Sequence, residues 1–462
     1  MAKTISGIKK SPFRRRLALS MAGFGSSSRY AAGGLGNLLK SPAQRRDANR
    51  ELLAREAERF VAELGKLKGA YVKIGQMLGI YGQYILPDPI TEALQSLNDR
   101  TAEVRWSTMD RALKTSLGPR YKDFAVNHSA LAAASLGQVH SAVYLPENRE
   151  LCLKIQYPGM AKAIDSDFRD VVRVMRMARW LRGDRESEGL LEEVHTLLKL
   201  EIDYLREAAM GQRIRQLLQG DQRYLVPEIY GEFCSPTLLA MEFVDGHKFT
   251  SPTVTALPQA QRNAIAQAVL ELFFQEIFHW RLMQTDPNFG NYLVVLDSGV
   301  PQLALLDFGA VREFDAGLMD ALCQTIAGAV DRDLAATTAG LNQLGCFRPD
   351  QGEASKTTFA EFCFLLVEPF RPGDASTPRD AVNARGEYCW AKANLVKRAA
   401  RLGATSALDR DFSVPPREFA LITRKLSGVF GAMAALGAEL NTSELLASYI
   451  ARWRAAGSDA EN

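Results

Sequence analysis

The chain has 462 residues, of which 47% are apolar and 24% are charged. These ordinary globular values exclude global disorder, and the length fits a bilobal enzyme or two domains better than one small domain. The net charge of +3 gives no reason to expect a nucleic-acid partner. Six scattered cysteines without C-x-x-C spacing argue against a disulfide framework and a zinc site, and favour a reducing compartment.

The chain begins with a basic arm, which we place at residues 1–45. The first 50 residues hold eleven Lys and Arg but a single acid, Asp47. Such an arm is typical of attachment to an anionic surface, namely a membrane, a nucleic acid or an acidic partner. A disordered leader and an organellar transit peptide are the alternatives. No run of about 20 purely apolar residues occurs, so we do not expect a spanning helix.

A helical block precedes the first clear strand. Apolar residues at helical spacing predict helices over 42–80, 90–98 and 108–117. Next, alternating and apolar runs predict a hairpin of strands 139–144 and 151–155. Two helices are then expected, over 161–182 and 188–215, followed by a strand pair over 229–233 and 238–243.

The remainder of the chain is predicted to be mostly helical. One hairpin interrupts it, with strands at 292–296 and 303–306 around a turn at 297–301. Residues 317–455 are predicted to be almost entirely helix.

A lone lysine stands in an apolar strand, in the run Leu151-Cys-Leu-Lys154-Ile155. Burying a lysine is costly unless it is paired, and a strand lysine that faces a helix carboxylate can hold nucleotide phosphates. The helix at 200–207 carries Glu201, Asp203 and Glu207, of which Glu207 is the expected partner of Lys154. The alternatives are an edge-strand lysine that reaches into solvent and a solvated acidic helix face.

Two polar loops follow strands of the second half. Asp286 is followed five residues later by Asn291, which is the spacing of a kinase catalytic loop. One hairpin later, an apolar strand ends in the D-F-G sequence of Asp307. In this pattern Asp286 would orient the nucleophile, while Asn291 and Asp307 would hold magnesium. The first motif alone would also fit an ordinary polar turn, and D-F-G alone is a weak signal.

Together, these elements predict an α+β, bilobal protein-kinase-like fold that binds ATP or ADP with Mg²⁺. A helical extension at 46–125 would precede a small N-lobe at 126–244 and a large helical C-lobe at 245–462. Met241 to Val244 falls where a kinase hinge belongs, so the backbone at Glu242 and Val244 would meet the adenine edge.

The chain departs from ordinary kinases at the loop that covers the phosphates. An alanine-rich stretch replaces the glycine-rich loop, and alanine restricts the close backbone approach that glycine permits. No A-P-E element follows Gly309. The nucleotide-binding residues expected in this stretch are Ala132, Ala133, Ala134, Ser135 and Val139.

These features resemble the UbiB-like atypical kinase family, whose members support ubiquinone (coenzyme Q) biosynthesis. The matching segments are K-x-G-Q at 73–76, the alanine-rich loop, the Lys154 strand, E-x-D at 201–203 and the two expected metal loops. The sequence Gln284-Thr-Asp286 is similar to the branch of this family that supports coenzyme Q synthesis and is shared with mitochondria. The resemblance implies that Lys73 and Gln76 lie near Glu201 and Asp203 and occlude the place of a protein substrate. It also implies ATPase behaviour and membrane association, with the basic arm attached to anionic membrane lipid.

We therefore predict an ATPase or small-molecule kinase that acts on, or extracts, lipid intermediates of quinone synthesis, with quinone biosynthetic enzymes as further partners. It would be cytoplasmic and peripheral to the membrane in a bacterium, or on the matrix side of the mitochondrial inner membrane in a eukaryote. Two alternatives stay open. One is a protein kinase, and the other is a nucleotide-gated scaffold without useful turnover.

Overall fold

The structure is a computed structural model that describes residues 41–67, 69–82, 85–97, 103–181, 183–297, 299–374, 376–406 and 415–460. Most of the predicted basic arm lies outside these residues. The chain divides into two compact units, Met1–Gln212 with Glu228–Phe243, and Arg213–Pro227 with Val244–Asn462. The finer four-part division remains a prediction. None of the helices that the structure describes is both long and apolar enough to cross a membrane.

The first unit begins with the predicted helical block, but the helix expected over 42–80 is divided into two helices, the second of which begins after Gly69. The apolar residues of the block belong to one core that also includes residues of the sheet and of the helices between residues 160 and 198. Gly79 allows a close approach there, because a Cβ at this position would lie 2.9 Å from the backbone nitrogen of Gln95 on the neighbouring helix. The helices of the block are α2 (Pro42–Leu67), α3 (Ala70–Tyr81), α4 (Asp88–Gln95) and α5 (Trp106–Leu117).

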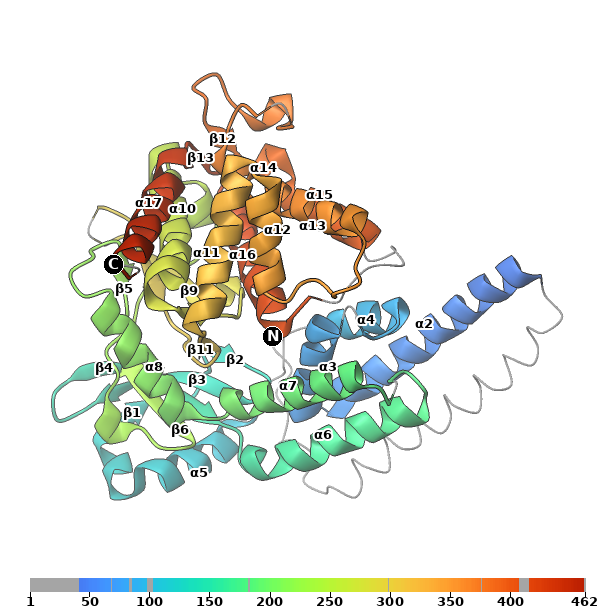
Figure 1. Cartoon of the computed structure of the whole chain (residues 1–462). Helices are drawn as coiled ribbons and strands as arrows, with labels where there is room; N and C mark the ends of the chain where they lie inside the picture. Colours follow the sequence, from blue (N-terminus) through green and yellow to red (C-terminus); the bar gives the residue numbers. More distant parts are fainter. Residues whose placement is uncertain are drawn as a thin grey trace. The chain divides into compact units, whose positions relative to one another are not determined.

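An antiparallel five-stranded sheet follows, in the order β1-β3-β4-β6, with β2 paired to β3. Helix α5 packs against it (Figure 1). Lys154 lies on β4 between Val139 on β3 and Leu239 on β6, so it is not on an edge strand. The strands are β1 (Phe124–Val126), β2 (Ala132–Ala133), β3 (Gly137–Tyr144), β4 (Arg149–Gln156) and β6 (Leu238–Glu242).

Two sequence predictions in this region are wrong. The helix expected over 188–215 is broken into α7 (Arg185–Glu201) and α8 (Tyr204–Leu217), which follow α6 (Met160–Met177). The break occurs because Asp203 caps α8, its carboxylate accepting from the backbone N–H of Arg206 at 3.0 Å. The strand expected over 229–233 is reduced to a single bridge between Ile229 and Met241, followed by a 3₁₀ turn, η3 (Gly231–Phe233).

The second unit contains the predicted hairpin, which is confirmed as an antiparallel pair. It lies in a four-stranded sheet ordered β5-β10-β9-β7, and a separate pair joins β8 to β11. The β9–β10 pair and the β8–β11 pair are both connected to the polar loops of the candidate site. The strands are β5 (Tyr224–Leu225), β7 (His247–Lys248), β8 (Leu282–Gln284), β9 (Tyr292–Val295), β10 (Gln302–Leu305) and β11 (Val311–Glu313).

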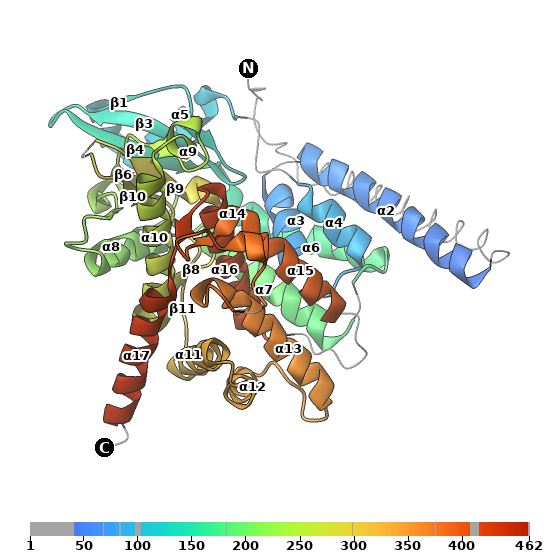
Figure 2. The same ribbon diagram turned by 90° about the horizontal axis from the view of Figure 1, so that it is seen from above.

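Helices make up most of this unit, as predicted, and α11, α12 and α13 lie side by side (Figure 2). A short strand pair, β12 (Tyr388–Cys389) with β13 (Glu439–Leu440), was not foreseen. The helices are α9 (Pro252–Thr255), α10 (Gln259–Gln275), the π-helical turn η4 (Glu276–Trp280), α11 (Ala316–Asp331), α12 (Leu334–Gln343), α13 (Glu353–Leu366), α14 (Trp390–Ala393), α15 (Leu395–Ser406), α16 (Arg417–Ala435) and α17 (Ser443–Ala460).

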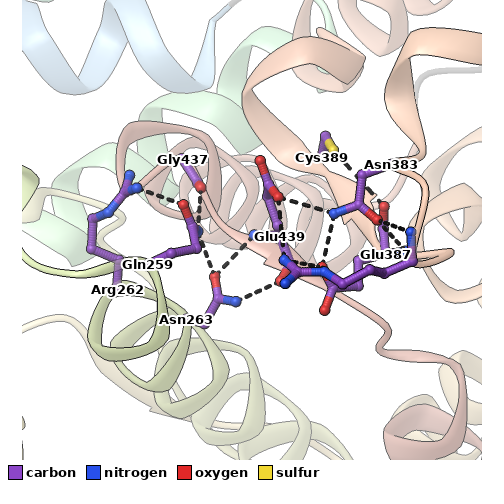
Figure 3. Close-up of polar contacts among 9 residues, drawn as sticks. Gln259, Arg262, Asn263, Asn383, Glu387, Cys389, Gly437 and Glu439 are labelled. Carbon is purple, nitrogen blue, oxygen red and sulfur yellow. Dashed lines mark hydrogen bonds and ion pairs between the residues drawn. The ribbon is translucent and has the colours of Figure 1, made fainter.

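A polar network fastens the end of α16 to the start of α10 (Figure 3). Arg262 donates to the carbonyl of Leu436 at 2.6 Å, and Asn263 donates to the carbonyl of Glu439 at the same distance. The carboxylate of Glu439 in turn accepts from Asn383 at 3.0 Å. The first bond satisfies the carbonyl of Leu436, the residue that caps α16, and the other two hold the chain that follows the helix, so the network fixes the end of α16 against α10.

Helix α16 also packs against the loop that joins β8 to β9. A Cβ at Gly428 would collide with Pro287 of the loop, whereas one at Gly431 would lie 3.4 Å from the ring of Phe289, an ordinary contact. Glycine at 428 is therefore required by the close approach of the helix to the loop.

This difference predicts unequal effects of two alanine substitutions on the same helix. Gly428→Ala should lower the free energy of unfolding by about 1–3 kcal/mol, because the added methyl group overpacks the contact with Pro287. Gly431→Ala is the matched control and should be neutral or stabilise by up to about 1 kcal/mol, because alanine favours helix. Urea denaturation of both variants measures the difference, and equal stabilities would contradict the packing argument.

Candidate functional site

The lysine of the central strand pairs with a buried glutamate of α8. Nζ of Lys154 lies 2.7 Å and 3.0 Å from the two carboxylate oxygens of Glu207. The Glu207 side chain is 1% exposed and that of Lys154 is 19% exposed. The ring of Tyr204 lies under the ammonium group, 5.3 Å from Nζ. The pair fixes the lysine head at the start of α8, where it can meet an anionic group.

The alanine-rich loop is a tight hairpin. Ala132 and Ala133 form β2 opposite Val139 and Gln138 of β3, and the N–H of Ala134 donates to the carbonyl of Gly137 at 2.9 Å. The hydroxyl of Tyr157 donates to the carbonyl of Ala134 at 3.2 Å, and Ser135 is buried. The loop is thereby held by its own sheet, and its predicted contact with phosphates remains a prediction.

The predicted hinge starts at the end of β6. The backbone N–H of Glu242 donates to the carbonyl of Glu228 at 2.8 Å, and the Glu242 carboxylate accepts from the N–H of Glu228 at 3.0 Å. An adenine contact at Glu242 would therefore use its carbonyl and not its N–H. Val244 follows the strand and is half-buried.

The K-x-G-Q and E-x-D segments meet through an ion pair between Lys73 on α3 and Glu201 at the end of α7. The other two residues have different contacts. Gln76 donates to the carbonyl of Leu97 at 3.3 Å, and Asp203 caps α8. The Lys73–Glu201 ion pair joins α3 to α7, whereas Asp203 caps the helix that carries Glu207. The regulatory role of all four residues remains a prediction.

In the second unit, Asp286 and Asn291 face each other across the loop between β8 and β9. The Asn291 amide nitrogen donates to Oδ2 of Asp286 at 3.1 Å. Arg424 from α16 lies on the other carboxylate oxygen, with Nη2 at 3.3 Å from Oδ1. The Asp286 side chain is 31% exposed, so its carboxylate can be reached by a small nucleophile.

Asp307 stands at the end of β10, beside Asn291. The backbone N–H of Leu306 donates to the carbonyl of Asn291 at 3.0 Å, and Oδ1 of Asp307 accepts from the N–H of Gly309 at 3.0 Å. Both Asn291 and Asp307 border a small cavity of about 20 Å³.

This donor set fits magnesium bound together with a nucleotide. Mg²⁺ prefers oxygen ligands and is usually held by one or two protein groups plus phosphates, so Asp307 and the amide oxygen of Asn291 would suffice. Among the residues that the structure describes, no cluster of three or more His, Cys, Asp or Glu could hold a metal by itself.

Gln284 joins the two polar loops, that of Asp286 and Asn291 and that of Asp307. Its amide oxygen accepts from the N–H of Asp286 at 3.0 Å, and its amide nitrogen donates to the carbonyl of Asp307 at 2.7 Å. Its own backbone N–H donates to Glu276 at 3.0 Å. One buried side chain therefore sets the spacing between the two loops.

Behind this link, Glu276 forms an ion pair with Lys425 of α16 at 3.3 Å, and both side chains are 3% exposed. Burial alone would lower the pKa of Lys425, but the Glu276 carboxylate and Tyr292 outweigh burial and raise this pKa, so the lysine stays charged. The hydroxyl of Tyr292 lies 3.2 Å from Nζ.

Sequence reasoning missed Glu276, Arg424 and Lys425 as site residues. Lys425 had a signal, because it interrupts the apolar stripe of Ile422 and Val429 at helical spacing. A lysine in such a stripe needs a buried partner, but nothing local to the sequence identifies Glu276 as that partner.

Comparison with known proteins places these observations in a family context. Residues 96–339, more than half of the chain, match the model of the ABC1 atypical kinase-like domain. The mitochondrial atypical kinase COQ8B of Rattus norvegicus is 31% identical over 84% of this chain and 71% of its own length. The mitochondrial atypical kinase COQ8 of Schizosaccharomyces pombe is 28% identical over 86% of this chain and 63% of its own length.

A solved structure shares the fold. The Rv3197–erythromycin complex from Mycobacterium tuberculosis superimposes with a TM-score of 0.59 at 24% identity, covering 87% of this chain and 97% of the other.

Removing Lys154 from its ion pair should destabilise the fold, because the buried Glu207 carboxylate would remain without the ammonium group. Lys154→Met should lower the free energy of unfolding by about 3–5 kcal/mol, since Glu207 would lose its ammonium partner. The double variant Lys154→Met/Glu207→Leu should recover most of that loss, because neither charge then remains buried. A double-mutant cycle by urea denaturation tests this, and additive effects would show that the two side chains are not coupled.

Proposed function

Because the chain belongs to the ABC1 atypical kinase-like family, we propose that it is a magnesium-dependent ATPase that supports ubiquinone biosynthesis at a membrane. The observation that carries the ATPase proposal is the constellation of Asp286, Asn291 and Asp307 on two loops that Gln284 joins. These residues supply a carboxylate for the nucleophile and oxygen ligands for a nucleotide-bound metal.

Family membership confirms several predictions from the sequence. The resemblance to UbiB-like proteins, the kinase-like α+β fold and the enzyme class are all confirmed. The general function, that of an atypical kinase-like enzyme of the family that supports coenzyme Q biosynthesis, is confirmed as well.

The residue roles form the mechanistic part of the proposal. Lys154, held by Glu207, would position the α and β phosphates, and the alanine-rich loop would cover them. Asp286 would orient the attacking hydroxyl or water and accept its proton. Asn291 and Asp307 would hold magnesium, which neutralises phosphate charge when it is bound. Catalysis would then rest on positioning and electrostatic stabilisation.

The Lys73–Glu201 ion pair favours a small or lipid substrate over a protein substrate. In the proposed role, α3 is held on α7 beside the E-x-D turn and occludes a protein substrate. A phenolic lipid precursor of quinones would be the substrate class, and anionic lipid would be bound by the basic arm. The cellular site would be the cytoplasmic face of a membrane in a bacterium or the matrix side of the inner membrane in mitochondria.

Nucleotide turnover by the purified chain is the central test. We expect hydrolysis of Mg-ATP that increases with anionic liposomes and a phenolic quinone precursor. Asp286→Asn should reduce the turnover rate by about 100-fold or more and leave nucleotide affinity nearly unchanged, because it removes only the proton acceptor. Tight Mg-nucleotide binding without turnover in any of these conditions would instead favour the nucleotide-gated scaffold.

Substitution of Lys73, which forms the ion pair between α3 and α7, distinguishes the ATPase function from a protein-kinase function. If Lys73 only occludes a protein substrate, Lys73→Ala should permit phosphate transfer from radiolabelled ATP to a protein or to the chain itself. Lys66→Ala is a suitable control, since Lys66 is an exposed lysine that pairs with Glu63 on α2. No labelling of protein by either variant, with ATPase activity retained, would argue against latent protein-kinase activity.

A further inference from the structure

The inference concerns the face of α16 that lies on the loop between β8 and β9. Arg424, Gly428 and Gly431 are spaced by four and three residues, so they share one face of the helix. The two glycines lie on Pro287 and Phe289 of the loop. The absence of a side chain at Gly428 lets the helix come close to Pro287, and Arg424 on the same face contacts Asp286.

The same helix is anchored on either side of this contact. At one end, Arg262 and Asn263 of α10 bind the chain that follows α16 (Figure 3). Next to Arg424, the buried Lys425–Glu276 pair fastens α16 to the turn that follows α10. Because Glu276 also binds the backbone of Gln284, α16 and the Asp286 loop are held by one carboxylate. The position of Arg424 beside Asp286 is therefore set by the fold.

The Asp286 loop has no cation of its own. Its sequence from Thr285 to Asn291 contains neither lysine nor arginine. Phosphoryl transfer spreads negative charge over the oxygens of the transferred group, and a cation aimed at that position lowers the barrier. In the second unit, the guanidinium of Arg424 is placed beside the carboxylate that would orient the nucleophile.

The Arg424–Asp286 contact differs from a structural ion pair of the same unit. Arg398 binds Glu368 through two bonds of 2.8 Å and 2.5 Å, and the Glu368 side chain is 1% exposed. Arg424 approaches Asp286 with one nitrogen at 3.3 Å, and the two side chains are 24% and 31% exposed. The Arg424–Asp286 contact is therefore longer and more exposed than the Arg398–Glu368 pair, so an arriving phosphate can reach the guanidinium.

We propose that Arg424 is a catalytic residue that binds the transferred phosphoryl group, a cation supplied by α16 within the same chain. The proposal rests on the ATPase function proposed above. In hydrolysis, the water oxygen forms a bond to the γ-phosphorus, and the bond from that phosphorus to the bridging oxygen breaks. ADP leaves with the electron pair, and the water proton passes to Asp286. Arg424 donates N–H groups to the γ-phosphate oxygens as their charge grows.

The test compares variants at position 424 with a control on the same helix. Arg424→Ala should lower kcat for Mg-ATP hydrolysis by about 100-fold or more, with nucleotide affinity changed less than about threefold, because the interaction forms mainly in the transition state. Arg424→Lys should retain an intermediate rate, since it keeps the charge but loses the planar fork. Arg417→Ala, at the exposed start of α16, should behave as the unaltered chain.

Chemical rescue separates catalysis from positioning. Added guanidinium chloride, at concentrations that leave the fold intact, should restore part of the activity of Arg424→Ala. It should not restore Asp286→Asn, nor Lys425→Met, in which the loss would come from a displaced helix. Circular dichroism and nucleotide binding establish that each variant is folded. If Arg424→Ala does not fold, Arg424→Gln, which keeps most of the stem, is measured in the same way.

Three results would overturn the proposal. Unchanged kcat in Arg424→Ala, or equal losses in kcat and nucleotide affinity without rescue, would reject the catalytic role of Arg424 while the ATPase function stands. Absence of turnover by the unaltered chain under all the conditions above would reject both proposals together.

Discussion

A buried ion pair, Lys425 with Glu276, supports the geometry of the residues that we propose as catalytic in the second unit. Such a pair is costly to desolvate and stabilises only when its geometry and hydrogen bonds are good, but removing one partner is strongly destabilising. Here the carboxylate also accepts the backbone N–H of Gln284, whose side chain reaches both Asp286 and Asp307. A displacement of α16 would therefore reach both loops through a short chain of bonds.

The first unit uses charge in the same way around the E-x-D turn. Lys73 is held at the end of α7 by Glu201, and Lys154 is held at the start of α8 by Glu207. The turn between these helices is tied to the central strand, since Gln156 at the end of β4 donates to the carbonyl of Ile202 at 3.0 Å. A shift of this turn would alter both lysines together. The physical link gives the proposed regulatory segment and the proposed phosphate-binding lysine a shared support.

Local patterns were enough to predict much of the fold and the core of the candidate site. The Lys154 strand, the hairpin of β9 and β10, and the helical second half follow from periodicity and turn residues. Predictions were wrong where side chains compete with that periodicity, as at Asp203, which ends one helical pattern by capping the next helix. Arg424 and Lys425 could not be assigned, because their partners Asp286 and Glu276 lie more than a hundred residues earlier and only tertiary packing joins them.

The link made by Gln284 has a consequence for how the two loops respond to acidity. A histidine at this position could also bridge the loops, but its ring changes charge near neutral pH and would then present two donors where one acceptor is needed. A carboxamide keeps one donor and one acceptor at every physiological pH. The hydrogen bond from the Asp286 backbone and the hydrogen bond to the Asp307 carbonyl therefore do not depend on the protonation state of residue 284 when the pH changes. Because the Gln284 amide does not titrate, its two bonds keep the loops at the same spacing across the physiological pH range.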